Sequence, residues 1–254
     1  MYPILFKLGP FTIASYGTML FLAFVTCYFL GRREFRRLEI PLVLMDDIMV
    51  LAMIGGIVGS KVYYLLENFT LFLQRPMAMA FATAGFTAYG GFILAAFLCT
   101  LAIRRKKESG IKIADLLVPM MALGYGIGRI DCQLAGDGDY GIPTTLPWGM
   151  SYPNGVIPTL EIVHPAPVYE TLYSIALFLF LWRRRKNSSW VGQQICLYLI
   201  FTGLGRFLVE FIRLNDRVLW GLSGAQIIAI AATLVGFVFL LRGHFKNKHS
   251  KLEV

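Results

Sequence analysis

Charged residues are scarce in this sequence. Only 15% of its 254 residues are Asp, Glu, Lys or Arg, whereas 57% are hydrophobic and the mean hydropathy is +0.63. A typical soluble domain carries about a quarter charged residues. Apolar runs of roughly 15–20 residues recur along the whole length, enough to cross a hydrocarbon core of about 30 Å. The composition therefore excludes an ordinary soluble domain and predicts a helical protein that crosses a membrane several times.

Recognisable catalytic and metal-binding motifs are also absent. The sequence contains no HExxH, no Walker loop and no Ser-His-Asp arrangement. Its four cysteines form no CxxC pair, and three of them lie within apolar runs. Neither a disulfide framework nor a metal centre is expected from such a pattern, and we expect no cofactor.

One short stretch has partial metal-binding character. Asp137-Gly-Asp139-Tyr-Gly141 resembles the first half of a calcium-binding loop, but Trp148 stands at the twelfth position, where such a loop needs a glutamate. A glycine-rich turn with solvated aspartates is the ordinary interpretation, and we favour it over a calcium site.

Positive charge is abundant but unevenly placed. The formal net charge is +9, and 17 of the 24 Lys and Arg residues lie in four segments, residues 32–37, 104–112, 183–186 and 242–251. Because cytoplasmic loops of membrane proteins are enriched in Lys and Arg, this pattern indicates topology, and nucleic acid is not expected as a partner. It predicts a periplasmic N-terminus, a cytoplasmic C-terminus and a periplasmic loop at about 131–165, where no Lys or Arg occurs.

Seven apolar segments are long enough to be interpreted as membrane-spanning helices. Their approximate ranges are 15–30, 48–66, 89–103, 113–130, 167–182, 190–211 and 225–241. An odd number of spans agrees with termini on opposite sides of the membrane. We therefore predict an all-α polytopic membrane protein in which residues 1–254 form a single integral membrane domain. A shorter apolar piece at 77–84 is expected to be an interfacial or re-entrant helix.

Two arginines and two tyrosines are predicted at similar depth in the membrane. Arg129 and Arg206 each lie 16 residues, or about 24 Å of helix, from the cytoplasmic start of their spans. Tyr16 and Tyr89 each lie 14 residues, or about 21 Å, from the cytoplasmic end of theirs. If these faces converge, the four side chains line one outward-facing polar cavity suited to an anionic headgroup.

The sixth span carries charges on one face. Arg206, Glu210 and Arg213 recur at i, i+4 and i+7. Glu210 can orient an arginine while leaving donors free, and the planar guanidinium fork binds two phosphate oxygens at once. A structural ion pair at the membrane rim is the alternative, which we favour for Arg213. Arg206 lies deeper and follows Gly203 and Gly205, so we favour a functional role for it.

Glycines surround other candidate positions. Gly128 and two earlier glycines precede Arg129, so another helix or a lipid headgroup can approach the backbone closely there. Gly55, Gly56 and Gly59 form a small-residue stripe that is typical of helix packing.

His164 precedes the fifth span. Tyr169 and Glu170 follow it closely, and a structural role for this histidine as a cap or hydrogen-bond partner is favoured over catalysis.

Several stretches together resemble one family, the prolipoprotein diacylglyceryl transferases of bacterial inner membranes. The matching pieces follow the family's order over nearly the whole chain: Ser15-Tyr16-Gly17, the segment from Gly55 to Tyr64, Gly90-Gly91, Gly128-Arg129-Ile130, the segment from His164 to Glu170, and the segment from Gly205 to Arg213.

The resemblance implies a reaction. The diacylglyceryl group of phosphatidylglycerol moves to the lipobox cysteine thiol of a prolipoprotein, a thioether forms and glycerol phosphate leaves. Arg129 and Arg206 are similar to the pair that holds the headgroup phosphate, and Glu210 is similar to the acid that supports Arg206. The expected substrate-binding residues are Tyr16, Gly90, Gly91, Gly128, Tyr169 and Glu170.

The chain departs from the family pattern at the proton-handling residue. Tyr89 stands where the family has the histidine of a His-Gly-Gly motif, and tyrosine, with a pKa of about 10, is a poor base near neutrality. Asp137, which replaces a family glutamate, His164 and the tyrosinate of Tyr89 are the candidate bases. The alternative function is a non-catalytic or altered-substrate family member that binds or handles anionic phospholipid. A small-anion transporter is less well supported, because no paired broken helices occur in two halves.

Overall fold

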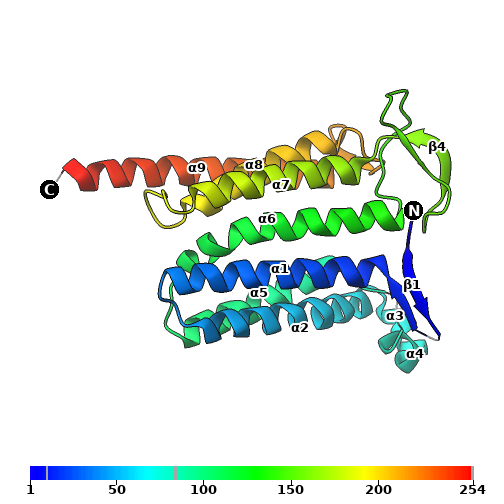
Figure 1. Ribbon diagram of the computed structural model, residues 1–254, viewed down its shortest axis with the longest axis horizontal. Helices are drawn as coiled ribbons and strands as arrows, with labels where there is room; N and C mark the ends of the chain where they lie inside the picture. The colour runs from blue at the N-terminus through cyan, green and yellow to red at the C-terminus, as the bar shows by residue number, and fades with distance from the viewer. Residues whose placement is uncertain (10, 83–84, 253–254) are drawn as a thin grey trace. The chain divides into compact units, whose positions relative to one another are not determined.

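The computed structural model describes residues 1–9, 11–82 and 85–252 and is mostly helical (Figure 1). Its helices are α1 (Ser15–Arg37), α2 (Leu42–Glu67), α3 (Phe69–Gln74), α4 (Pro76–Ala80), α5 (Ala88–Arg105), α6 (Gly110–Ala135), α7 (Ala166–Arg184), α8 (Gln193–Val209) and α9 (Gly224–Leu252). Its strands are β1 (Ile4–Leu8), β2 (Phe11–Ala14), β3 (Met150–Tyr152), β4 (Thr159–Val163), β5 (Arg217–Leu219) and β6 (Leu222–Ser223).

Four helices are long and apolar enough to cross a membrane, namely α2, α5, α6 and the part of α9 up to Asn247. Helix α8 is apolar but shorter. The protein is therefore a polytopic membrane protein, as its composition predicted. Each of the seven predicted spans falls on a helix, although α8 begins at Gln193 and ends at Val209, inside the predicted range 190–211. Crossing by α1, α7 and α8 stays a prediction.

The all-α prediction was wrong in one respect. The described residues also contain three two-stranded antiparallel sheets, β1–β2, β3–β4 and β5–β6. All three lie outside the seven predicted spans, and their short strands carry too little period-two pattern to be recognised in the sequence. The predicted short helix at 77–84 corresponds in part to α4 (Pro76–Ala80), while positions 83–84 lie outside the described residues.

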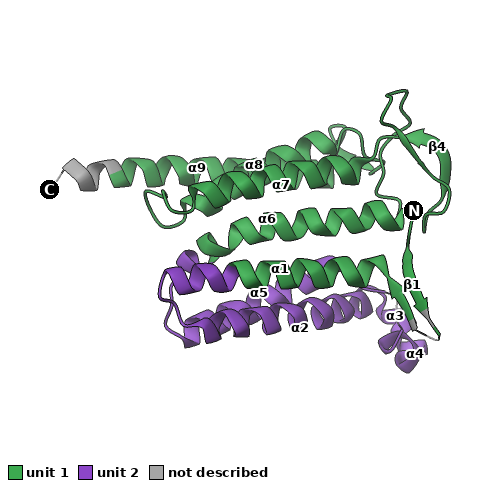
Figure 2. Cartoon of the chain, viewed as in Figure 1, with its two compact units in different colours: residues 1–30, 114–254 green, residues 31–113 purple. Residues whose placement is uncertain are grey.

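The chain divides into two compact units (Figure 2). Unit 1 comprises residues 1–30 and 114–254, and unit 2 comprises residues 31–113. Helices α1 and α6 each cross the division. The expected single membrane domain over residues 1–254 stays a prediction.

Unit 2 is built on the contact between α2 and α5. A Cβ at Gly55 would lie 2.6 Å from the Cα of Ala95, and a Cβ at Gly59 would lie 2.7 Å from the Cβ of Leu94. Only glycine permits so close an approach of two helix backbones. The prediction that the Gly55–Gly59 stripe serves helix packing is confirmed for these two positions.

In unit 1, α6, α7 and α8 share a core. Ala122, Leu177 and Leu181 are buried together, with partly buried aromatic side chains packed around them. Helix α9 packs closely on α8. A Cβ at Gly203 of α8 would lie only 2.6 Å from the carbonyl oxygen of Ala229 on α9.

The start of α8 is fixed by another helix. Gly192 precedes α8 with a φ of +105°, a conformation that favours glycine, and the Asp115 carboxylate on α6 accepts a hydrogen bond from the Ile195 amide at 2.9 Å. This bond satisfies one of the unpaired amides of the first helical turn. The registers of α6 and α8, which carry the two predicted arginines, are thereby linked.

The segment between α6 and α7 is closed at its base by backbone hydrogen bonds. The Gly141 amide donates to the His164 carbonyl at 2.8 Å, and the His164 amide donates to the Ile142 carbonyl at 3.0 Å. The Ile142 amide in turn donates to the Ile212 carbonyl at 2.8 Å, beyond α8. These bonds bring the turn after α6 alongside the segment after α8.

Candidate active site

Glu170, in the first turns of α7, lies between the two predicted arginines. Its side chain is only 4% exposed. Its Oε1 lies 2.9 Å from Nη1 of Arg206, on the last turn of α8, and its Oε2 lies 2.9 Å from Nε of Arg129, near the end of α6. One buried carboxylate therefore joins guanidinium groups from two helices, and the predicted convergence of Arg129 and Arg206 is realised within unit 1.

Three further groups complete this arrangement. Tyr125 donates its hydroxyl to Oε1 of Glu170 at 2.8 Å, and Nη1 of Arg213 lies 3.3 Å from Oε2. Asp139 contacts both Arg129 and Arg213 through its two carboxylate oxygens. We call the set formed by Arg129, Glu170, Arg206, Arg213, Asp139 and Glu210 the arginine cluster.

Glu210 supports Arg206 from the other side. Its Oε2 lies 2.9 Å from Nη2 of Arg206, while its Oε1 accepts hydrogen bonds from Ser223 at 2.8 Å and Asn215 at 2.6 Å. The predicted i, i+4 pairing of Arg206 with Glu210 is confirmed, and Glu210 is fully buried. Since its carboxylate is held by three partners, Glu210 fixes the Arg206 side chain in one orientation.

The arginine cluster has three cations and three carboxylates, and it nevertheless keeps donors available. A guanidinium has five N–H donors. Within the described residues, Nη1 and Nη2 of Arg206 each have one partner and its Nε has none, and Nη2 of Arg129 has none. The side chain of Arg206 is 27% exposed. An oxyanion can therefore bind to this face of the cluster without displacing a carboxylate.

Asp139 is held in its charged form. Partial burial acts to raise the pKa of its carboxyl group, but Arg213 and Arg129 outweigh this effect and hold the pKa below its usual value. A carboxylate paired with two guanidinium groups is a poor proton acceptor near neutrality.

Comparisons with known proteins reveal the family. The family model for prolipoprotein diacylglyceryl transferase matches residues 3–242. The chain belongs to this family. It is 33% identical over 243 residues to the phosphatidylglycerol–prolipoprotein diacylglyceryl transferase of Clostridium tetani, covering 94% of this chain and 97% of the relative. It is 34% identical to the enzyme of that name from Chlorobaculum tepidum, over 85% and 79% of the two chains, and 29% identical to that of Thermotoga maritima, over 93% and 83%.

His164, predicted as a candidate base of this family member, belongs to a separate small group. Its Nδ1 lies 3.2 Å from the hydroxyl of Tyr169, which also accepts a hydrogen bond from Nε1 of Trp148 at 2.8 Å. Two side chains thus orient Tyr169, whose predicted substrate contact stays a prediction.

Asp137, Cys132 and Asp139 offer three potential ligand atoms within 4.8 Å of one another. Both oxygens of Asp139 contact arginines, and Nη1 of Arg129 lies 3.5 Å from the sulfur of Cys132. A guanidinium so close to the donors opposes a divalent cation, so this set does not suit calcium. Asp137 accepts a hydrogen bond from the Asp139 amide at 3.3 Å, as in a tight turn.

The other predicted substrate residues have varied surroundings. A Cβ at Gly128 would meet no atom within 4 Å, so the backbone before Arg129 is open to a ligand. Tyr16 is 67% exposed. Tyr89 lies in unit 2 and is 66% exposed, whereas Gly90 and Gly91 beside it are buried against α2. Their closeness to α2 gives both glycines a packing role, and their contact with substrate stays a prediction.

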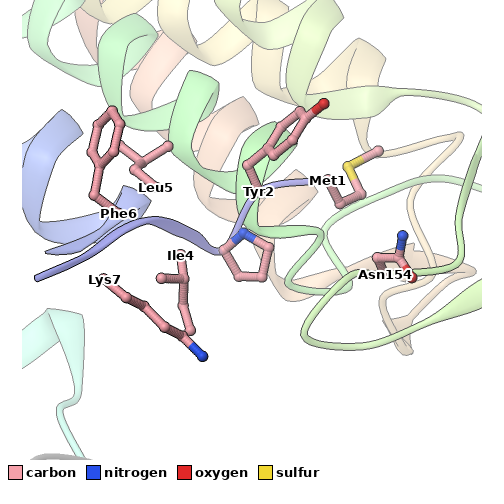
Figure 3. Close-up of a pocket in the computed structure, with 8 residues that line it drawn as sticks. Met1, Tyr2, Ile4, Leu5, Phe6, Lys7 and Asn154 are labelled. Atoms are coloured by element: carbon pink, nitrogen blue, oxygen red, sulfur yellow. The ribbon is translucent and has the colours of Figure 1, made fainter. Parts of the chain in front are cut away.

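A cavity of about 440 Å³ is formed by the N-terminal residues Met1 to Lys7 and Asn154. Figure 3 shows Asn154 on a separate loop beside the N-terminal strand. None of the predicted site residues lines this cavity.

Sequence reasoning missed two members of the site. Tyr125 received no role, and Asp139 was considered only for calcium. The structural ion pair predicted for Arg213 is confirmed, since its side chain is 8% exposed and pairs with Glu170 and Asp139, while its place at the membrane rim stays a prediction. Tyr125 lies four residues before Arg129 on α6, and this spacing was the available signal.

Proposed function

We propose that this protein is a phosphatidylglycerol–prolipoprotein diacylglyceryl transferase. It moves the diacylglyceryl group of phosphatidylglycerol to the lipobox cysteine thiol of a prolipoprotein. Its family membership supports the activity, and the joining of Arg129 and Arg206 through Glu170, at 2.9 Å on each side, carries the assignment of the site.

The reaction needs an anion site. The substrate thiolate attacks the glycerol carbon of the diacylglyceryl group, a carbon–sulfur bond forms, and the carbon–oxygen bond to phosphate breaks. Negative charge then grows on the leaving glycerol phosphate. The unused N–H groups of Arg129 and Arg206 are suited to stabilise this charge, because donors held in place by the protein need no reorganisation during the reaction.

The arginine cluster also defines what each carboxylate does. Glu170 sets the separation of the two guanidinium groups, and Glu210 orients Arg206. Both are positioning residues in this mechanism. The thiol proton leaves to a base, for which His164, Asp137 and the tyrosinate of Tyr89 are candidates. Asp139 is unsuited because the two arginines lower the pKa of its carboxyl group.

We propose a topology with seven crossings, by α1, α2, α5, α6, α7, α8 and α9. The uneven distribution of Lys and Arg supports a periplasmic N-terminus, a cytoplasmic C-terminus and a periplasmic segment between α6 and α7. The family is named for prolipoprotein modification, which supports a location in the bacterial inner membrane with the site facing the periplasm.

Transfer by the purified full chain tests the proposal. Phosphatidylglycerol and a lipobox peptide are supplied, and the thioether product and released glycerol phosphate are measured. We expect Arg206→Ala to lower the rate at least about a hundred-fold, since losing one preorganised donor of this kind costs roughly 10²–10³ in rate. The exposed Arg183→Ala, at the end of α7, is the matched control and should retain the native rate.

Arg206→Lys separates charge from geometry. Lysine keeps the charge but lacks the planar fork that reaches Glu170 and Glu210 together, so it should restore only a small part of the rate. Native protein that binds phosphatidylglycerol but releases no glycerol phosphate would instead identify a non-catalytic lipid-binding member of the family.

A further inference from the structure

A second cavity lies within unit 2, between the start of α2 and the end of α5. Its volume is about 430 Å³. Asp46 and Asp47 of α2 line it together with Arg105 and Lys106 at the end of α5. Its remaining walls are aliphatic, including Val50 and Leu98. The cavity is thus apolar along the helices and charged at one end.

The charged end contains both carboxylates and cations, and they do not all form ion pairs with one another. Asp46 lies 3.4 Å from Nη1 of Arg32. Within the described residues, however, Asp47, Arg105 and Lys106 make no ion pair, although they line the same cavity. Part of this pattern has a local cause, since Arg105 lies in the last turn of α5, where a cation is favoured, whereas α2 has no acidic residue in its first turn. That cause does not explain why opposite charges face one cavity and leave it open.

We propose that this cavity binds a zwitterionic phospholipid whose headgroup carries a phosphate and a primary ammonium. The phosphate meets Arg105 and Lys106, the ammonium meets Asp47, and the acyl chains lie along the aliphatic walls. Such a headgroup separates its two charges by a few atoms, so it can bridge groups that do not reach each other. Both helices qualify as membrane spans, so their ends lie where phospholipid headgroups are found.

This site is distinct from the arginine cluster. All of its lining residues belong to unit 2, whereas every member of the cluster belongs to unit 1. The inference therefore does not depend on the proposed transfer reaction, in which phosphatidylglycerol is a substrate.

Lipid binding to the purified full chain, followed by native mass spectrometry, tests the proposal. The probes are phosphatidylethanolamine, phosphatidylcholine and phosphatidylglycerol with identical acyl chains. Because phosphatidylglycerol also binds at the proposed transfer site, binding to the cavity is counted as the part that Arg105→Gln removes. In that part we expect phosphatidylethanolamine to bind most tightly, since its ammonium can donate hydrogen bonds to Asp47 while the quaternary ammonium of phosphatidylcholine cannot. Asp47→Asn should weaken phosphatidylethanolamine about five-fold and leave phosphatidylglycerol unchanged.

Variants of the cations complete the test. Arg105→Gln should weaken all three lipids, because each carries the phosphate, and the neighbouring exposed Arg104→Gln, which does not line the cavity, is its control. Glu108 does not line the cavity either, so Glu108→Gln is the control for Asp47→Asn. Equal binding of phosphatidylethanolamine and phosphatidylglycerol, with no effect of Asp47→Asn, would overturn the proposal and indicate a cation-only site for anionic lipid. Because the cavity lies outside the arginine cluster, the variants should keep the native rate of thioether formation.

Discussion

The two units of this protein bring their helices together by opposite means. In unit 2, α2 and α5 approach until the backbones of their glycines contact backbone and side-chain atoms of the other helix. The residues named for that contact are all uncharged. In unit 1, α6, α7 and α8 meet around a buried carboxylate and three guanidinium groups. The first contact depends on the absence of side chains, and the second depends on a few polar atoms being satisfied together. The two should respond differently to substitution.

The largest effect is expected from Glu170→Gln in unit 1. The amide keeps the shape of the side chain but removes the negative charge shared by three arginines, so their positions shift. Displacement of catalytic groups by about 1 Å costs roughly a hundred-fold in rate, and breaking a buried ion pair costs about 3–5 kcal/mol of stability. Transfer rate and thermal unfolding measure the two effects. The exposed Glu161→Gln on β4 is the control, and native behaviour of Glu170→Gln would show that the cluster does not depend on this carboxylate.

Unit 2 should be most sensitive to added volume. A Cβ at Gly90 would contact Tyr63 and Gly59, so Gly90→Ala should lower the free energy of unfolding by about 1–3 kcal/mol. Gly56→Ala is the matched control, because a Cβ there would meet no atom within 4 Å and alanine favours a helix. Thermal unfolding of both variants measures the effect. Equal melting temperatures of Gly90→Ala and Gly56→Ala would mean that the close approach of α2 and α5 contributes nothing to stability.

A smaller effect, confined to unit 1, concerns pH. The folded-state pKa of Asp139 lies below its unfolded value of about 3.9, so its stabilisation is complete above that pH and is lost as the pH falls through the folded-state pKa. We expect Asp139→Asn to lower the melting temperature by about 2–4 °C at pH 5 to 8. The difference should shrink below about pH 4. A constant difference down to pH 3 would contradict the assignment of these ion pairs.

The smallest effect is expected from Cys132→Ser. The cysteine sulfur lies 3.5 Å from Nη1 of Arg129, and a serine hydroxyl can accept the same hydrogen bond. Transfer activity should therefore stay within about two-fold of the native rate, which is the scatter expected for a change of this size. A strong loss of activity would assign Cys132 a direct part in the reaction.

Much of the helical framework could be predicted, because long apolar runs have few alternatives in a membrane. Helical rise also predicted that Arg129 and Arg206 lie close together, and their shared contact with Glu170 confirms this, while their depth in the membrane stays a prediction. The part of the site that was missed depends on contacts between segments distant in sequence. Asp139 reaches Arg213 because the turn after α6 pairs with the segment after α8, through the Gly141–Arg213 bridge. No local pattern in either segment specifies that pairing.

Unit 2 shows what a glycine pattern leaves open. The Gly55–Gly59 stripe predicted a close contact with another helix, but it did not identify α5 as that helix, because a stripe of small residues permits close packing without specifying the partner. Gly90 and Gly91 were predicted to contact substrate from the family resemblance; their burial against α2 gives them a packing role, and the substrate contact stays a prediction.

The segment between Gly141 and His164 is tied to its surroundings at more than its two ends. Gly141 and His164 bond to each other and Ile142 bonds to Ile212, while the Val156 and Ile157 amides donate to the Ala135 and Gly136 carbonyls at 2.9 Å. A change of length within this segment should therefore shift the turn that carries Asp139 and disturb its ion pairs with Arg129 and Arg213.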